Sequence, residues 1–348
     1  MLKRNYIPLG VTIGLFLLMF IAGSFRYTGF FSGQVLLNLL IDNAFLLITA
    51  VGMTFVIVSG GIDLSVGSVI ALTTMVSASL LQQGWPPALV ILLVLIMGTV
   101  FGTAMGAAIH YFNIQPFIVT LAGMFLARGL CYVISINTIT IDNAFYTAVA
   151  QTKIKLPGDH FVSISVIIAL VVVALGIYLA HYTKFGRNTY AIGGSEASSL
   201  LMGLPVARTK LMVYGFSGLC SALAGVVFTF YMLSGYGLHA NGMELDVIAA
   251  VVIGGTLLTG GVGYVVGTFF GVLIQGVIQT IISFEGTLSS WWTRIVIGIL
   301  LLLFILLQRL LGERRSPSEG KENEGDAHEK NLRRNAQVFF ALFQRNRL

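Results

Sequence analysis

The sequence predicts an all-α integral membrane protein with about ten transmembrane helices. Of its 348 residues, 56% are hydrophobic and only 10% are charged, and the mean hydropathy is +0.90. Soluble domains carry about 25% charged residues. The apolar residues fall in long runs, and a helix in lipid pairs all of its own backbone groups. A large soluble domain is therefore excluded.

The first apolar run covers residues 7–23 and follows Lys3 and Arg4. Positive charge before a first span places the N-terminus inside, and no small-residue cleavage site follows to suggest a signal peptide. Further spans are predicted at residues 35–58, 66–82, 88–111, 116–136 and, after a long polar segment, 162–181.

Residues 182–210 form the longest polar interior segment and carry four cations against Glu196. Positive charge accumulates on cytoplasmic loops, so this segment is expected inside the cell. Four more spans, at 211–233, 247–258, 264–284 and 291–311, return the C-terminus to the same side. We therefore divide the chain into a transmembrane domain, residues 1–311, and a charged cytoplasmic tail, residues 312–348, expected to be disordered.

Glycine-rich breaks interrupt two of these spans. One break contains Gly60, Gly61, Asp63 and Ser65, and the eighth span runs into Gly260 and Gly261. Unpaired backbone is costly in lipid, so such breaks indicate broken or re-entrant helices that face protein or a water-filled cavity. An ordinary surface turn is the alternative, because paired glycines are also common turn signals.

The candidate substrate path consists of eight residues in and near the breaks: Asp42, Asn43, Gly60, Gly61, Asp63, Ser65, Gly260 and Gly261. Ionisable groups inside a membrane are usually functional or paired. For both aspartates we favour a structural role, accepting hydrogen bonds from backbone N–H groups freed by a broken helix, over direct contact with substrate. His110 and Arg128 are expected to reach the membrane interface, and Arg294 is expected to anchor there.

Two internal similarities favour an inverted repeat. Ile62-Asp63 resembles Leu245-Asp246, and the pattern Gly-Thr-x-x-Gly occurs at residues 102–106 and again at 267–271. Both pairs lie five spans apart, so the two halves would face opposite ways, as in many transporters. Chance is the alternative, because Gly-x-x-x-Gly is common in apolar helices.

Motifs for an enzyme are missing. The chain has no phosphate-binding Walker loop, no metal-ligand spacing and no nucleophile elbow. Cys131 and Cys220 lie inside apolar runs and are expected to be buried thiols. The net charge of +6 is a topology signal. We therefore expect no catalytic activity, metal, cofactor or nucleic-acid partner.

A short helix is predicted at residues 195–202, with Ser195 as N-cap and Gly203 as terminator. A small capped helix on the cytoplasmic face would suit docking of a soluble partner.

Several motifs together resemble the permease subunits of bacterial sugar ABC importers of the ribose/xylose/galactose type. They are GGIDLSVGS at residues 60–68, PFIVTL at 116–121, AIGGSEA at 191–197 and MG at 202–203. The resemblance covers nearly all of residues 1–311. DNAF at residues 42–45 and GTLSSWW at 286–292 resemble more narrowly the permease of a galactofuranose importer.

The resemblance implies a permease in the bacterial inner membrane, surrounded by lipid and with both termini cytoplasmic. Its implied partners are a cytoplasmic ATP-binding cassette ATPase, a periplasmic sugar-binding protein and a second permease subunit, with a heterodimer favoured over a homodimer. It also implies that an ATPase coupling loop contains Gly193, Gly194, Glu196, Ala197 and Gly203. The competing hypothesis is an ion-coupled secondary transporter with Asp42 and Asp63 as its ion site. The motifs leave the identity of the sugar open.

Overall fold

The computed structural model describes residues 7–158, 160–287, 289 and 291–313. The chain divides into two units, Met1–Leu301 and Leu302–Leu348. Most of the predicted cytoplasmic tail, from residue 314 on, lies outside the described residues.

The first part of the chain forms six helices. They are α1 (Ile7–Arg26), α2 (Gly33–Asp42), α3 (Ala44–Val58), α4 (Val66–Gln82), α5 (Pro87–Tyr111) and α6 (Pro116–Ile134). The span predicted over residues 35–58 is bent, because α2 and α3 meet at an angle of 59°. Asn43 lies at the bend, and its side-chain amide donates to the Leu39 carbonyl at 2.9 Å. Such a local bond competes with the helical backbone ladder.

The polar segment after α6 is structured. It contains β1 (Ile139–Thr140), α7 (Ala144–Gln151), β2 (Lys153–Leu156) and β3 (His160–Ser163). The strands β2 and β3 form an antiparallel hairpin, and β1 pairs with β4 (Ser234–Gly235). The side chain of Asn143 caps α7, and Tyr146 of this helix is fully buried.

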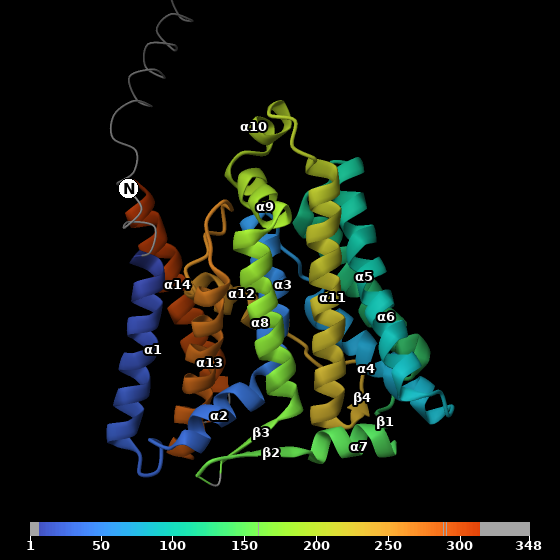
Figure 1. The fold of residues 1–348 in the computed structure, drawn as a ribbon, viewed down its shortest axis with the longest axis vertical. Helices are drawn as coiled ribbons and strands as arrows, with labels where there is room; N and C mark the ends of the chain where they lie inside the picture. Colours follow the sequence, from blue (N-terminus) through green and yellow to red (C-terminus); the bar gives the residue numbers. More distant parts are fainter. Residues whose placement is uncertain (1–6, 159, 288, 290, 314–348) are drawn as a thin grey trace, which may run out of the picture. The chain divides into compact units, whose positions relative to one another are not determined.

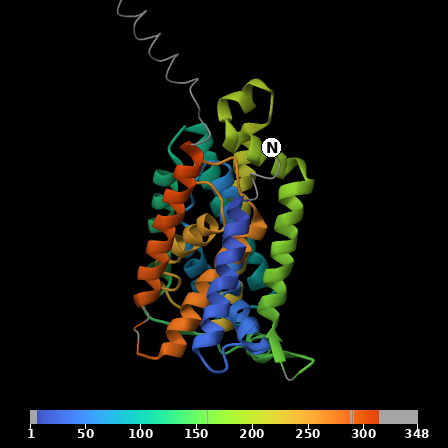
Figure 2. The same ribbon diagram turned by 90° about the vertical axis from the view of Figure 1, so that its left-hand side faces the viewer.

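The remaining helices are α8 (Ile164–Tyr182), α9 (Lys184–Gly194), α10 (Glu196–Leu201), α11 (Val206–Met232), α12 (Met243–Ile253), α13 (Val265–Glu285) and α14 (Trp291–Glu313). Within the first unit, α9 and α10 lie at the end where α1 begins (Figure 1). The hairpin of β2 and β3 and the helix α7 lie at the opposite end. The perpendicular view shows the same separation of α10 from the hairpin (Figure 2).

Six helices of the described chain are long and apolar enough to cross a membrane, or seven if the bent pair of α2 and α3 counts as one span. The predicted count of about ten is not confirmed. Helix α4 has 17 residues and α12 has 11, where residues 247–258 were expected. At about 1.5 Å per residue, α12 is only about half as long as a hydrocarbon core about 30 Å thick. It is a half-helix whose ends lie among other helices.

Helices α3 and α11 form the centre of the first unit. Every residue of α3 except Phe45 is buried. Helix α3 packs against α11, α8, α12 and α13, while α11 packs against α5 and α4. Where α5 meets α11, a Cβ on Gly218 would lie 2.1 Å from the Gly98 carbonyl oxygen, so the two backbones touch.

The helix contacts are compatible with the predicted inverted repeat. Helix α11 contacts α4 and α5, and α3 contacts α12 and α13, which are their counterparts in the predicted second half. The repeated threonines take part: Thr103 of α5 lies against Gly215 of α11, and the hydroxyl of Thr268 in α13 is 2.7 Å from that of Thr54 in α3. The repeat itself stays a prediction.

Candidate functional site

The break after α3 is a tight turn that depends on glycine. Gly60 has a φ of +84°, in the left-handed region that side chains rarely adopt. Its N–H and that of Gly61 donate to carbonyls of the last turn of α3, at 2.9 and 3.0 Å. A Cβ on Gly61 would lie 2.3 Å from the Tyr214 hydroxyl oxygen. The turn therefore requires glycine at residues 60 and 61.

Asp63 follows this turn and is buried, with 1% of its surface exposed. One carboxylate oxygen accepts from the Ser65 backbone N–H at 3.0 Å and from the Ser65 hydroxyl at 2.6 Å. The other accepts from the Ser217 hydroxyl of α11 at 2.8 Å. These bonds match the structural role expected for Asp63, since they tie the start of α4 to α11. That Asp63 and Ser65 line the substrate path remains a prediction.

Five glycines from three segments meet in what we call the glycine junction: Gly60, Gly193, Gly194, Gly260 and Gly261. A Cβ on Gly193 would lie only 1.7 Å from the Val58 carbonyl oxygen. That same oxygen accepts the Gly261 N–H at 2.8 Å. A Cβ on Gly260 would lie 2.9 Å from both the Gly193 oxygen and the Gly60 Cα. Backbone thus packs directly on backbone.

The glycine junction joins two sets of residues that the sequence kept apart. Gly60, Gly260 and Gly261 were assigned to the substrate path, whereas Gly193 and Gly194 were assigned to the coupling loop. In the structure the last two end helix α9 and lie against both breaks. Tyr190 of α9 adds a further tie, because its hydroxyl donates to the Gly263 carbonyl at 2.7 Å. Burial raises the pKa of Tyr190 to about 12, so the hydroxyl remains a donor at neutral pH.

Helix α10 confirms the predicted capped helix. The Ser195 hydroxyl accepts the Ser198 N–H at 3.2 Å, and Gly203 follows the helix with a φ of +74°. Glu196 and Ala197 are exposed in its first turn, and Lys210 pairs with the Glu196 carboxylate at 2.6 Å. The helix ends on three exposed apolar side chains, Leu200, Leu201 and Met202. It therefore presents an apolar tip with a charged pair beside it.

Asp42 and Asn43 lie apart from the glycine junction, at the bend between α2 and α3. Asn43 is buried, while Asp42 is exposed and its carboxylate accepts a hydrogen bond from the Tyr231 side chain of α11. Asp42 and Asp63 each have their own partners. Among the described residues, no group of three His, Cys, Asp or Glu side chains could hold a metal ion.

Arg128 has partners in the protein that the expectation of an interfacial side chain did not include. Its guanidinium Nη1 donates to the carbonyls of Gly237 and His239 at 2.6 and 2.7 Å. It therefore holds the segment that leads into α12. An unpaired cation inside an apolar helix is costly, so the sequence indicates that Arg128 needs a partner but does not identify it.

Glu244, in the first turn of α12, makes a buried contact that the sequence did not single out. The carboxylate of Glu244 lies over the first turn of α4, where a Cβ on Gly67 would be 2.5 Å from its Oε2 atom. A glycine at residue 67 thus leaves the space that this carboxylate fills. Local sequence patterns do not indicate this contact, because Gly67 and Glu244 belong to different predicted halves.

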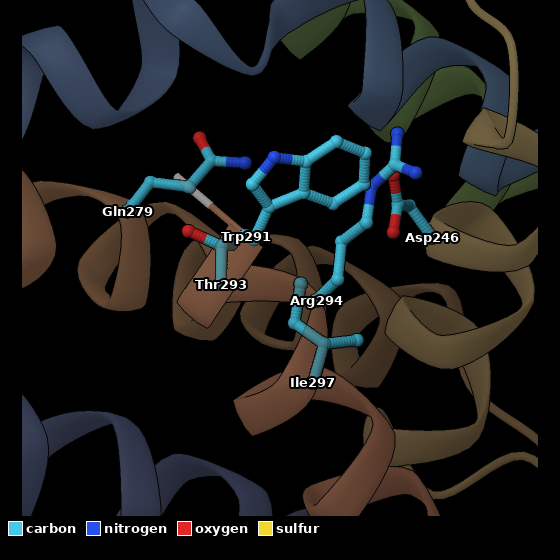
Figure 3. A pocket seen from close by; sticks show the side chains of 6 residues that line it. All are labelled: Asp246, Gln279, Trp291, Thr293, Arg294 and Ile297. Atoms are coloured by element: carbon cyan, nitrogen blue, oxygen red, sulfur yellow. The ribbon is translucent and has the colours of Figure 1, made fainter. Parts of the chain in front are cut away.

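Asp246 and Arg294 line a cavity of about 340 Å³ (Figure 3). The other described residues that line it are Gln279, Trp291, Thr293 and Ile297. The Arg294 guanidinium carbon lies 5.1 Å from the centre of the Trp291 ring. Arg294 was expected to anchor at the interface, and its contact with this cavity was not foreseen.

Both cysteines are buried free thiols, as expected.

Comparison with known proteins places the chain among membrane transport components. A family model described as "Branched-chain amino acid transport system / permease component" matches residues 35–305. The inner membrane ABC transporter permease protein YjfF of Escherichia coli (strain K12) is 52% identical over 91% of this chain and 97% of its own length. No solved structure matches the chain significantly.

Two further relatives carry substrate names. The fructose import permease protein FruG of Bifidobacterium longum is 43% identical over 88% of this chain and 92% of its own length. The ribose import permease protein RbsC of Bacillus subtilis is 41% identical over 86% and 92%. Because the family model and these relatives all span most of the sequence, the chain belongs to the family of branched-chain amino acid transport system permease components.

Proposed function

We propose that this chain is the permease subunit of an ATP-binding cassette importer that carries a monosaccharide across the bacterial inner membrane. The chain belongs to the permease family, and relatives named for fructose and ribose import support a sugar as its substrate. The observation that carries the mechanism is the glycine junction, where the end of α9 touches both glycine-rich breaks. A force applied to α9 or α10 reaches the end of α3 and the segment between α12 and α13 through these backbone contacts.

The apolar tip of α10 docks on a separate cytoplasmic ATPase. Nucleotide binding and hydrolysis move the ATPase, and α9 passes this motion through Tyr190 and the glycine junction to the segments that precede α4 and α13. The permease then alternates between outward- and inward-facing states. A periplasmic sugar-binding protein delivers the substrate. A second permease subunit completes the path, in a heterodimer by preference and a homodimer otherwise.

We propose a galactofuranose-like sugar as substrate. Its support is the resemblance of residues 42–45 and 286–292 to galactofuranose permeases. A neutral sugar needs no fixed counter-charge, which suits a path with few ionisable groups. An amino acid, as in the description of the family, is zwitterionic and would require paired charges. The comparisons give no support to an ion-coupled transporter, and Asp63 already accepts three hydrogen bonds from protein groups.

The test is uptake into proteoliposomes that contain both permeases and the ATPase, with binding protein outside. Labelled galactofuranose, fructose, ribose and leucine are compared, and uptake of a sugar is expected only with internal ATP. The matched control carries an ATPase whose Walker lysine is replaced. Uptake by this chain alone, driven by a proton gradient, would overturn the importer, and uptake of leucine alone would overturn the sugar.

A further inference from the structure

The cavity in Figure 3 lies between three helices that the sequence did not connect. Asp246 belongs to the first turn of α12, Gln279 to α13, and Trp291, Thr293 and Arg294 to the first turn of α14. Its volume of about 340 Å³ falls within the range of small-molecule pockets, about 300–1,000 Å³. The cavity is thus large enough for a monosaccharide.

The polar side chains of this cavity are available to a ligand. No hydrogen bond joins the side chains of Asp246, Gln279, Thr293 or Arg294 to another described residue, and the cavity is open, since Gln279, Trp291 and Arg294 are exposed. Together they offer a carboxylate acceptor, an amide with both functions, a hydroxyl and a guanidinium donor. Polyhydroxylated molecules need this mixture of donors and acceptors, since each of their hydroxyls can donate and accept.

Trp291 supplies the apolar part of the cavity. Its ring lies between the Gln279 amide and the Arg294 guanidinium, and its indole N–H adds a donor (Figure 3). Aromatic rings with a polar edge suit ligands that have one apolar face and one polar, hydrated face. A sugar ring has this character, because its C–H groups gather on one face and its hydroxyls point outward.

The charges of the cavity favour a neutral ligand. The Asp246 carboxylate points toward the Arg294 guanidinium, and the two attract one another. Their formal charges cancel, so neither an anion nor a cation gains net attraction, and a zwitterion, the other ligand that suits paired charges, is tested by the leucine arm of the uptake experiment. A lipid phosphate would meet Arg294 but also the repulsion of Asp246. An uncharged, hydroxyl-rich solute meets no such penalty.

We infer that this cavity is a monosaccharide-binding subsite of the permease itself. Asp246, Gln279 and Trp291 contact the sugar, and Arg294 balances the charge of Asp246 while donating to a hydroxyl. The inference rests on the proposed function and adds to it a place where the permease recognises its substrate.

The test uses the assembled importer in nanodiscs without binding protein. The chain has three tryptophans, and the double variant Trp85→Phe/Trp292→Phe leaves Trp291 as its reporter, with ATPase and second permease made free of tryptophan. Titration with the transported sugar should change Trp291 emission in a saturable way. Adding Gln279→Leu should raise the apparent Kd about tenfold, which corresponds to about 1.4 kcal/mol.

Transport provides the matched comparison, because neighbouring tryptophans differ in their contact with the cavity. Trp291→Ala should slow sugar uptake about tenfold, as the loss of one good contact of about 1.4 kcal/mol predicts. Trp291→Phe should keep most of the rate, and Trp292→Ala should leave it unchanged, because Trp292 does not line the cavity. Stimulation of the ATPase by binding protein should stay normal in all three variants.

The outcomes separate the two proposals. If the unmodified importer moves no sugar, the proposed function fails and the subsite with it. Suppose that it moves sugar, that Trp291 emission does not change with sugar, and that Trp291→Ala transports at the same rate as Trp292→Ala. The subsite alone is then wrong. If emission responds to phosphatidylglycerol in the nanodisc and not to sugar, the cavity binds lipid headgroups and the inference is overturned.

Discussion

Gly193 and Gly194 are neighbours with opposite requirements for space. A Cβ on Gly193 would collide with the Val58 carbonyl oxygen, whereas nothing lies within 4 Å of the Cβ position of Gly194. Both residues end α9, where an alanine would otherwise favour the helix. Comparing alanine at the two positions therefore separates the need for close backbone contact from any effect on helix propensity.

Replacing Gly193 by alanine should destabilise the protein by about 1–3 kcal/mol, the usual cost of overpacking. It should also abolish coupled uptake, because α9 must move away from both breaks. Thermal unfolding of the purified permease and uptake by the reconstituted importer measure the two effects. Gly194→Ala is the control and should match the unmodified chain. Equal behaviour of the two variants would mean that the glycine junction is not closely packed.

Asp63 offers a second test at the same scale. Asp63→Asn replaces a charged acceptor of three hydrogen bonds, and bonds to charged groups contribute about 1.5–3 kcal/mol each. Ser217→Ala removes only one of them and should cost less. Unfolding by a denaturing detergent gives both values. If Asp63→Asn leaves stability unchanged but stops uptake, the carboxylate acts in transport and its structural role is wrong.

Helix α10 is the element with the clearest functional prediction. Glu196→Lys should detach or uncouple the ATPase while the permease stays folded, because exposed ion pairs contribute only about 0.2–1 kcal/mol. Lys210→Ala breaks the same pair and keeps Glu196, so it should leave coupling largely intact. Co-purification of the ATPase and ATP-driven uptake are measured for both. Normal co-purification and uptake with Glu196→Lys would exclude a docking role for this residue.

At the scale of elements, the sequence predicted most helices and both glycine-rich breaks, but it missed the bend between α2 and α3. Long apolar runs and capping residues located α5, α6, α8, α10 and α13 well, because these signals are local. The bend at Asn43 was not predicted, because the polar pair Asp42-Asn43 contains no glycine or proline and apolar residues continue on both sides. The pairing of Arg128 with the segment before α12 was also missed. It joins residues more than a hundred positions apart, and periodicity carries no information about such contacts.

The topology of the whole molecule can be tested with cysteines. Lys155 lies exposed in β2 and Ser198 lies exposed in α10, at opposite ends of the first unit. The native cysteines are buried and should react little. An impermeant thiol reagent should label Lys155→Cys in intact cells with an opened outer membrane. It should label Ser198→Cys only after the inner membrane is opened, and the reverse pattern would invert the proposed orientation.

For the whole molecule, composition alone predicted the membrane class, and motif order predicted the permease family that the comparisons then showed. The candidate site was predicted residue by residue but not as an assembly. Nothing in the sequence indicated that the glycines of the coupling loop and of the two breaks share one contact. Nor did it bring Asp246, Gln279 and Trp291 together, because three separate helices must fold before that cavity exists.

The burial of α3 has a consequence for how the chain is made. This helix leaves the ribosome early, yet α8, α11, α12 and α13, which cover it, are synthesised much later. Until then, Thr49 and Thr54 must face lipid, a chaperone or the insertion machinery. Nascent chains arrested before α11 should for that reason be prime targets of membrane quality-control proteases, and slow translation of the second half would lower the yield of the finished permease.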